Sequence, residues 1–305
     1  MADKSNRILG VLEGDQPGPL MLFIAALHGN ETHGIDAFRH IYQSLVDHKI
    51  KIKGKIVGIL GNMQAIEQEE RFIDYDLNRS WKEDYLKILV NSSQYYHAED
   101  SEMMALRDVI SDYEEGEYSA KVMVDLHGTS SDNGNFIVVP EDEGSHPVIQ
   151  ALHLPVVIDL DKYLEGTLLG YYHARGFVSF AFEGGLIGSE EAKDLHVSGI
   201  WEILDAAGVI SHHDHHDLDH YEKKLKSISK DLPKVVKAFH RHWVDVEDNF
   251  KMKPGYRNFQ KLQKGEELAK DKYGPIYAPQ DGMIFMPLYQ DAGNDGFFIV
   301  KEVEA

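Results

Sequence analysis

Short apolar runs alternate through most of the chain with segments in which apolar positions recur every three or four residues. The apolar runs predict six strands, at residues 20–27, 55–60, 121–126, 135–139, 155–160 and 177–182. After the first run, Ile35, Phe38, Ile41 and Leu45 recur at the spacing of a helix face. Strands that alternate with helices are typical of a mostly parallel sheet covered on both faces. The pattern therefore predicts an α/β fold.

The pattern changes near residue 244, where short alternating segments are separated by glycine and proline. We therefore expect two domains, a catalytic one at residues 1–243 and a small β-barrel-like one at residues 244–305. Phrases of the second domain are similar to those of biotinyl and lipoyl carrier barrels. The modifiable lysine between methionines is missing, so we expect no carrier role.

His28 and Glu31 stand three positions apart between the strand at 20–27 and the following helix. In open α/β sheets, ligands bind at this edge. A catalytic zinc usually takes three protein ligands and leaves a position for water. The chain has no cysteine, so any zinc must be held by histidine, aspartate or glutamate.

His127 is the best candidate for the third ligand, because it also ends an apolar strand and precedes a glycine. Asp125, two positions earlier, lies on the same strand face and is placed to orient the His127 ring. The alternative is that these are ordinary histidines among the 17 of the chain. Burying such polar groups without a partner is costly, which favours the metal site.

Residues 71–81 combine two arginines, an asparagine and two aspartates with little hydrophobic periodicity. Asn78 and Arg79 are suited to grip a carboxylate, the guanidinium by a forked ion pair and the amide by a further hydrogen bond. The alternative is a solvated turn before the amphipathic stretch at 81–90. The sequence alone leaves both interpretations open.

Three motifs, in this order and spacing, resemble the succinylglutamate desuccinylase and aspartoacylase family of zinc carboxypeptidase-like amidohydrolases. They are His28-x-x-Glu31, Arg71 followed by Asp76-Leu77-Asn78-Arg79, and Asp125-Leu126-His127. The resemblance covers most of the chain. It implies a carboxypeptidase-like α/β/α sandwich, with a C-terminal β domain that partly covers the active-site mouth.

The resemblance also implies ligands and binding residues. One zinc ion per chain would be held by His28, Glu31 and His127. The pair Asn78 and Arg79 would hold the carboxylate of the substrate.

Three further roles follow from the same resemblance. Arg71 would polarise the scissile carbonyl and stabilise its oxyanion, and Asp76 would hydrogen-bond the His28 ring. Glu183, at the end of the strand at 177–182, would be the general base and acid. A carboxylate buried at a strand end is costly without a function. The alternative role of Glu183 is to pair with a nearby arginine.

The implied activity is hydrolysis of the amide bond of an N-acyl amino acid, such as N-succinylglutamate or N-acetylaspartate. The products would be a carboxylic acid and an amino acid. Two alternatives stay open: a metallocarboxypeptidase that cuts a small peptide, and a zinc-binding protein without catalysis. Mammalian aspartoacylases place a substrate-binding tyrosine late in the chain, where this sequence offers Phe297 and Phe298, which weakens an assignment to N-acetylaspartate.

The net charge is -20, from 31 basic and 51 acidic residues. Such a charge argues against binding nucleic acid or an anionic membrane surface. A small anionic substrate would need local arginines. The N-terminus lacks the apolar stretch of a signal peptide, and no segment is long enough to cross a bilayer, so we expect a cytoplasmic protein. A homo-oligomer is compatible with the sequence.

The segment at 212–220 is the richest in histidine. His212 with His216, or His216 with His220, would be one helical turn apart and suited to a second metal. A solvated helix start is the interpretation we favour, since aspartates are preferred there. Tyr171 and Arg175 are four positions apart on one helix face, and a role in lining the substrate pocket stays open for them because such spacing is weak evidence.

Overall fold

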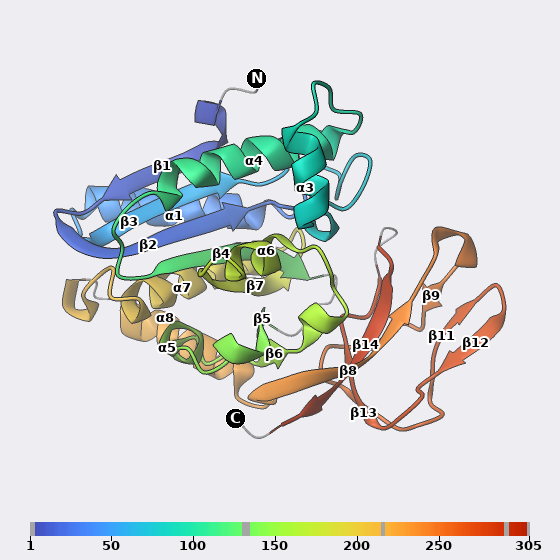
Figure 1. Cartoon of the computed structure of the whole chain (residues 1–305). Coiled ribbons are helices and arrows are strands. Elements are labelled where there is room, and N and C mark those ends of the chain that lie inside the picture. The colour runs from blue at the N-terminus through green and yellow to red at the C-terminus, as the bar shows by residue number, and fades with distance from the viewer. Residues whose placement is uncertain (1–3, 130–134, 215–216, 290–292, 304–305) are drawn as a thin grey trace.

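A large mixed sheet forms the centre of the protein (Figure 1). The computed structural model describes residues 4–129, 135–214, 217–289 and 293–303. The strands of this sheet are β1 (Ile8–Glu13), β2 (Gln16–Ala25), β3 (Lys53–Leu60), β4 (Lys121–Thr129), β5 (Phe136–Val138), β6 (Val156–Ile158), β7 (Val178–Leu186), β8 (Val235–Trp243), β10 (Lys261–Leu262), β13 (Gly282–Phe285) and β14 (Asp295–Glu302). Their order is β1-β3-β2-β4-β7-β5-β6-β8-β14-β13-β10.

The middle of the sheet is parallel, as the sequence predicts. β3, β2, β4 and β7 pair in parallel, and so do β5, β6 and β8. β5 is antiparallel to β7. All six predicted strands are confirmed within a few residues, whereas the edge strand β1 and the strand β8 were not predicted.

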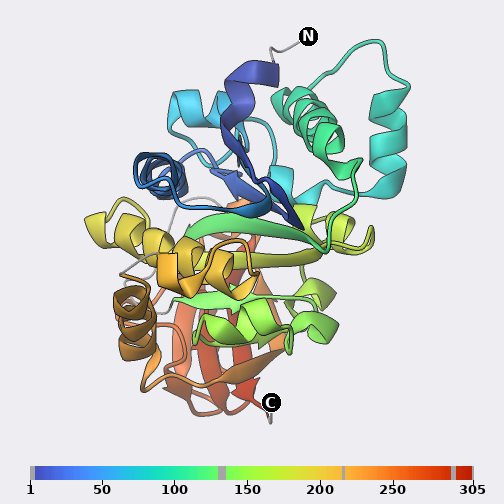
Figure 2. The ribbon, with the colours of Figure 1, turned by 90° about the vertical axis from the view of Figure 1, so that its left-hand side faces the viewer.

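Helices cover both faces of the sheet (Figure 2). The helices are α1 (His33–Asp47), α2 (Met63–Gln68), α3 (Glu83–Val90), α4 (Ala98–Glu114), α5 (Pro147–Ala151), α6 (Leu168–His173), α7 (Glu190–Ala206) and α8 (Leu218–Ser229). Short 3-10 turns span Lys4–Arg7, Leu77–Arg79, Glu141–Glu143, Leu160–Lys162, His212–Asp214 and Val246–Asp248. The α/β architecture is therefore confirmed.

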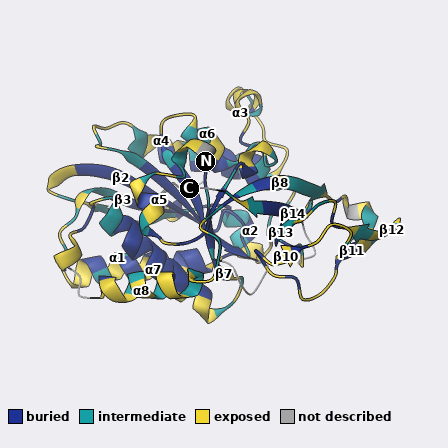
Figure 3. Ribbon diagram, turned by 90° about the horizontal axis from the view of Figure 1, so that it is seen from below, coloured by how far each residue is buried: buried dark blue, intermediate teal, exposed yellow. Residues whose placement is uncertain are grey.

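The central strands are buried on both faces (Figure 3). Along β2, Met21 and Phe23 join the core under α1, α5, α7 and α8, while Leu20 and Leu22 join the core under α3, α4 and α6. Because successive side chains of a strand point to opposite faces, a strand between two helix layers must be apolar throughout. This explains the unbroken apolar run by which β2 is recognised.

Some of the C-terminal strands extend the same sheet, and the others form a small sheet of their own (Figure 1). β14 pairs with β8 from 295 to 302, and the small sheet consists of β9 (Lys251–Met252), β11 (Glu267–Asp271) and β12 (Gly274–Tyr277). Phe297 and Phe298 are fully buried in the two cores on either face of β14. The division at residue 243 stays a prediction, and hydrogen bonds of the main sheet run across it.

In the part of the chain that the structure describes, no helix has the length and apolar character needed to span a membrane.

Candidate metal centre and catalytic site

The loop between β2 and α1 carries the first two candidate ligands. β2 ends at Ala25 and α1 begins at His33, so His28 and Glu31 lie at the carboxyl end of a central parallel strand. Both are almost fully buried. Gly29 lies so close to α2 that a Cβ atom there would be 2.1 Å from the carbonyl carbon of Ala65. The tight path of this loop therefore needs a glycine at that position.

His28, Glu31 and His127 form one compact group, which we call the metal cluster. His28 Nδ1 lies 3.0 Å from Glu31 Oε1, and His127 Nδ1 lies 2.9 Å from Glu31 Oε2. The three ligand atoms are all within 4.8 Å of one another. A single metal ion is able to contact all three, so the structure brings together the ligands that the sequence predicts.

Each histidine of the metal cluster is also held from its other ring nitrogen. His28 Nε2 lies 3.3 Å from Asp76, and His127 Nε2 lies 2.6 Å from Asp125. Carboxylates in this position fix the orientation of metal-binding imidazoles. The contact expected between Asp125 and His127 is confirmed. Two histidines, one glutamate and a free side toward a cavity fit a catalytic zinc site.

Strong local charges accompany this geometry. Burial alone would lower the pKa of His127, but Asp125 and Glu31 outweigh it and raise that pKa well above its usual value. Burial would raise the pKa of Glu31, but His28 and His127 lower it well below its usual value. Without metal, His127 therefore keeps its second ring proton to a higher pH than usual, and metal binding would release a proton held there.

The loop at 71–79 places Arg71 and Arg79 in the wall of the same cavity. Arg71 donates to Glu31 at 3.1 Å and to Asp76 at 3.5 Å, so its guanidinium lies against the metal cluster. Burial would raise the pKa of Asp76, but His28 and the two arginines hold it well below its usual value. The alternative of a solvated turn is not what the structure shows, because Asn78 is buried and Arg71 is mostly so.

Glu99, at the start of α4, holds this loop in place and was missed by the sequence analysis. Its fully buried carboxylate accepts the backbone N–H groups of Ile73 at 2.7 Å, Asp74 at 2.9 Å and Tyr75 at 3.3 Å. It also accepts the side-chain amide of Asn62 at 3.0 Å. A glutamate at a helix N-terminus is an ordinary feature, so the sequence offered no signal for this contact.

Asn78 and Arg79, which we call the carboxylate clamp, come from the 3-10 turn after Asp76. The Asn78 side-chain oxygen accepts the backbone N–H of Leu168 at 2.9 Å, which leaves its NH₂ group for a ligand. Arg79 donates to Asp295 at 3.2 Å and is 27% exposed in its side chain. Asp295 is shared with Arg241 at 2.5 Å, so the C-terminal region reaches the clamp.

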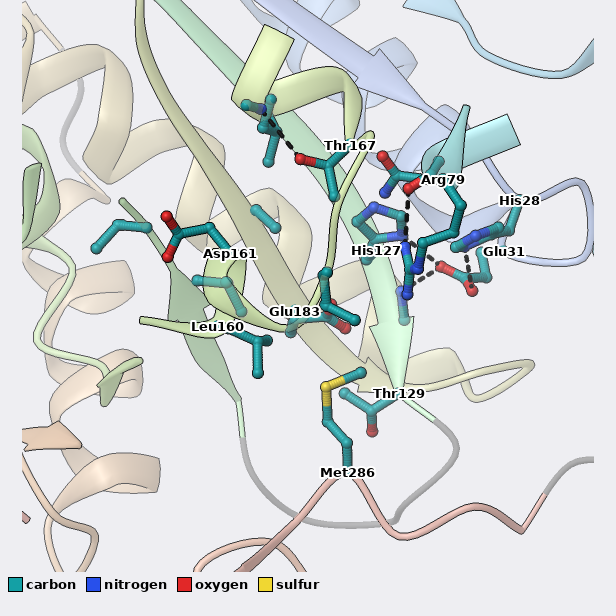
Figure 4. A pocket seen from close by; sticks show the side chains of 18 of the residues that line it. His28, Glu31, Arg79, His127, Thr129, Leu160, Asp161, Thr167, Glu183 and Met286 are labelled. Atoms are coloured by element: carbon teal, nitrogen blue, oxygen red, sulfur yellow. Dashed lines mark hydrogen bonds and ion pairs between the residues drawn. The ribbon is translucent and has the colours of Figure 1, made fainter. Parts of the chain in front are cut away.

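Glu183 lies beside the metal cluster, because its strand β7 places it next to His127 of β4 in the parallel register. It lines the cavity that also contains the metal cluster and the carboxylate clamp (Figure 4). Within the described residues, no hydrogen-bond or ion-pair partner of its carboxylate is found. Burial raises the pKa of Glu183 to about 8, with Glu31 and Asp125 adding to the effect and His127 and Arg71 opposing it.

The raised pKa of Glu183 predicts how stability of the metal-free protein depends on pH. The folded chain keeps a proton up to about pH 8 that the unfolded chain releases near 4.5, so the free energy of unfolding falls as pH rises through this interval. The slope due to this group is at most about 1.4 kcal/mol per pH unit. Glu183→Gln removes it, because glutamine does not titrate. Urea unfolding of both proteins after chelation should show that the free energy of unfolding of the variant, relative to that of wild type, increases as pH rises. Parallel pH profiles would contradict the assignment.

Tyr171 and Arg175 are not part of the cavity wall. Tyr171 and Arg175 stack on each other, and Arg175 donates to Glu83 at 2.7 Å. Neither is among the described residues that line the cavity, so the structure does not support a pocket role for them; Leu169 and Gly170, near the start of α6, line the cavity instead.

The histidine-rich segment shows one ion-pair arrangement. His212 contacts Asp205 at 2.9 Å and Asp219 at 3.1 Å, and α8 begins at Leu218 after Asp217. His216, which both expected metal pairs need, lies outside the described residues. The alternative of a second metal site is therefore not tested.

The fold and the site together define an α/β protein with a His-Glu-His metal cluster at the carboxyl ends of its central strands. The chain belongs to the succinylglutamate desuccinylase/aspartoacylase family: the model of that catalytic domain matches residues 17–196. The resemblance noted from the motifs is thereby confirmed.

Individual relatives agree with the family. A probable aspartoacylase of Prochlorococcus marinus is 31% identical over 171 residues, which are 53% of this chain and 52% of that protein. The chain thus spans about half the length of this relative. A succinylglutamate desuccinylase of Shewanella frigidimarina is 24% identical over 85% of this chain and 76% of its own. A succinylglutamate desuccinylase/aspartoacylase structure from Rhodobacter sphaeroides has the same fold, with a TM-score of 0.68 at 15% identity over 97% of this chain and 88% of that one.

Proposed function

We propose that this chain is a zinc-dependent amidohydrolase, which cleaves the amide bond of an N-acyl amino acid and releases a carboxylic acid and an amino acid. The observation that carries the proposal is that the metal cluster, the carboxylate clamp and Glu183 line one cavity. Membership of a family whose relatives are named desuccinylases and aspartoacylases supports it.

The metal cluster fits zinc, which is held by two histidines and one glutamate in many hydrolases. A zinc ion bound there would supply Lewis acidity, lowering the pKa of a water molecule and polarising a carbonyl oxygen. Its positive charge would also favour the ionised form of Glu183, which burial otherwise disfavours.

The substrate would be oriented by the carboxylate clamp. Arg79 forms an ion pair with the carboxylate of the amino acid, and the Asn78 NH₂ group donates a further hydrogen bond. In the structure the Arg79 guanidinium is already held by Asp295, so its direction is set before a substrate arrives. A clamp arranged in advance loses less conformational entropy on binding.

The reaction itself needs one proton carrier and one cation from the protein. Glu183 takes a proton from the attacking water, and the water oxygen bonds to the amide carbon. Arg71, held against the metal cluster by Glu31 and Asp76, donates to the carbonyl oxygen as negative charge develops on it. Glu183 then passes its proton to the amide nitrogen, and the C–N bond breaks.

The decisive experiment combines metal analysis with a substrate panel. The purified protein should contain about one zinc per chain, and it should hydrolyse at least one N-acetyl, N-succinyl or N-formyl amino acid until a chelator removes the metal. Small peptides with a free C-terminus are tested in parallel. Exclusive cleavage of peptides would make the protein a carboxypeptidase, and stoichiometric zinc without any turnover would leave it a binding protein.

Arg79→Ala tests the carboxylate clamp. Loss of a charge-assisted hydrogen bond of about 1.5–3 kcal/mol predicts a rise in KM of roughly tenfold or more, with a smaller change in kcat. The measurement compares an N-acyl amino acid with the corresponding amide, which lacks the carboxylate and should be insensitive to the change. Arg39→Ala on the exposed face of α1 is the matched control. An unchanged KM for the carboxylate substrate would remove Arg79 from the clamp.

A further inference from the structure

The guanidinium of Arg79 is held in part by protein groups and in part free for a ligand. Its Nη1 donates to the backbone carbonyl of Asn78 at 2.8 Å, and its Nη2 donates to Oδ2 of Asp295 at 3.2 Å. Within the described residues, the other N–H donors of this guanidinium remain for a substrate. Asp295 lines a neighbouring hollow and is not among the described residues that line the cavity. It therefore holds Arg79 from outside the space of the substrate.

Asp295 is itself fixed by Arg241 of β8. Its Oδ1 accepts a hydrogen bond from Arg241 Nε at 2.5 Å while its Oδ2 accepts one from Arg79, so one carboxylate bridges two guanidinium groups. The side chains of Arg241 and Asp295 are 17% and 16% exposed, so the pair is mostly withdrawn from solvent. Charge-assisted hydrogen bonds in such positions hold a side chain more firmly than exposed ion pairs do.

Arg241 connects this pair to a second part of the cavity wall. Its Nη1 donates to the backbone carbonyl of Tyr163 at 2.6 Å, and its guanidinium carbon lies 4.4 Å from the ring centroid of Trp243. Tyr163 belongs to the segment at 160–164, other residues of which line the cavity. Through these contacts Arg241 joins both the carboxylate clamp and this segment to strand β8.

A bulge in β14 directs Asp295 toward this group. In the pairing of β14 with β8 (Figure 1), Asp295 is opposite Trp243 and Phe297 is opposite His242, so Gly296 is an extra residue. In a regular strand Asp295 and Phe297 would point to the same face. The bulge instead places Asp295 on the face of Trp243, while Phe297 stacks on His242 at 4.9 Å on the other face. A Cβ atom on Gly296 would come within 2.7 Å of a neighbouring side chain, so the bulge favours glycine there.

We propose that Asp295 and Arg241 are positioning residues of the carboxylate clamp. Asp295 fixes the direction of the Arg79 guanidinium, and Arg241 fixes Asp295 and joins it to the cavity wall. Neither needs to touch the substrate. The inference rests on the proposed function, since it assigns the substrate carboxylate to Arg79. It adds that the C-terminal region, through one ion-pair chain, sets the affinity of the clamp.

The kinetic test is a double-mutant cycle of Asp295→Ala with Arg79→Ala. Alone, Asp295→Ala should raise KM for a hydrolysed N-acyl amino acid about three- to tenfold and change kcat less, because an unfixed guanidinium loses more conformational entropy on binding. Added to Arg79→Ala, it should raise KM no further. The same rise in both backgrounds would show a structural role only and overturn the proposal. A fall in KM would also overturn it, because Asp295 would then compete with the substrate carboxylate.

Variants of Arg241 and a control complete this series. Arg241→Ala should raise KM as Asp295→Ala does, because Asp295 then loses the contact that fixes it. Arg241→Lys keeps the charge without the planar fork that reaches both Asp295 and Tyr163, and should restore KM only in part. Asp84→Ala removes an exposed aspartate that pairs with Lys87 on α3 and should leave KM unchanged. An unchanged KM in Arg241→Ala would overturn the part of the proposal that concerns Arg241.

A chemical measurement separates failure of this inference from failure of the proposed function. Phenylglyoxal modifies accessible guanidinium groups, and mass spectrometry of peptides gives the rate at each arginine without any need for hydrolysis. In Asp295→Ala the rate at Arg79 should rise about threefold or more, while the rate at the exposed Arg39 stays the same. Such a rise supports the inference even if no acyl derivative is cleaved, and an unchanged rate overturns it even if hydrolysis is observed. Asp295→Asn, which keeps the shape and removes the charge, replaces Asp295→Ala should that variant not fold.

Discussion

Glu183→Gln is expected to lower kcat by about 10²–10⁴-fold while zinc remains bound, since general acid–base catalysis contributes this much. Glutamine has the shape of a protonated glutamate, but it neither accepts the proton of the attacking water nor delivers one to the leaving nitrogen. Metal binding should survive, because the candidate ligand atoms belong to His28, Glu31 and His127. The experiment measures kcat, KM and zinc content of the same preparation.

The control for this variant is Glu191→Gln, which removes an exposed carboxylate from the first turn of α7. It should change neither kcat nor zinc content. Activity of Glu183→Gln within about threefold of wild type would remove Glu183 from the proton transfer, because such a change is far below the expected loss. Loss of zinc from the variant would instead show that Glu183 takes part in metal binding.

Glu99→Ala is expected to have the largest effect on stability. The change removes the acceptor of three partly buried backbone N–H groups and of the buried Asn62 amide, and it leaves these donors without that partner. Each buried donor left without a partner costs about 1–3 kcal/mol, so we expect the free energy of unfolding to fall by more than about 3 kcal/mol. Urea unfolding followed by circular dichroism measures this loss.

The same variant should impair catalysis more than a general loss of stability would. The backbone at 73–75 connects Arg71 to the carboxylate clamp, so both should lose their alignment with the metal cluster. We therefore expect kcat/KM to fall well below wild type under conditions in which the variant is still folded. Asp112→Ala, an exposed change on the same helix, should alter stability by no more than about 0.5 kcal/mol. Equal stability of Glu99→Ala and wild type would contradict the anchoring role.

The elements that the sequence predicts are those with a strong local signal. Residues 20–25 are apolar because β2 is covered on both faces, and Ile35, Phe38, Ile41 and Leu45 are buried along α1. In contrast, β1 is partly exposed along most of its length, and β8 alternates between buried and partly exposed positions. Such edge and border strands give no unbroken apolar run, so the same method misses them.

The candidate metal ligands are also encoded locally. His28 and Glu31 stand after one strand and His127 lies near the end of another, and parallel strands bring their carboxyl ends to one edge of the sheet. The prediction that these residues meet follows from that rule alone. Glu183 follows the same rule on β7, and its function as base and acid stays a proposal for the Gln variant to test.

The sequence by itself therefore determined the α/β class, the central strands and the residues able to hold a metal ion. These features can be recognised from neighbouring residues, because they depend on periodicity and on where strands end. The tertiary structure decided the rest. Arg79 and Asp295 are 216 positions apart, and Glu99 holds backbone groups some 25 positions away. The lining of the cavity combines residues of β5, β7 and α6 with Met286 from the C-terminal part of the chain. No local pattern marks such contacts, since they exist only after the chain has brought distant segments together.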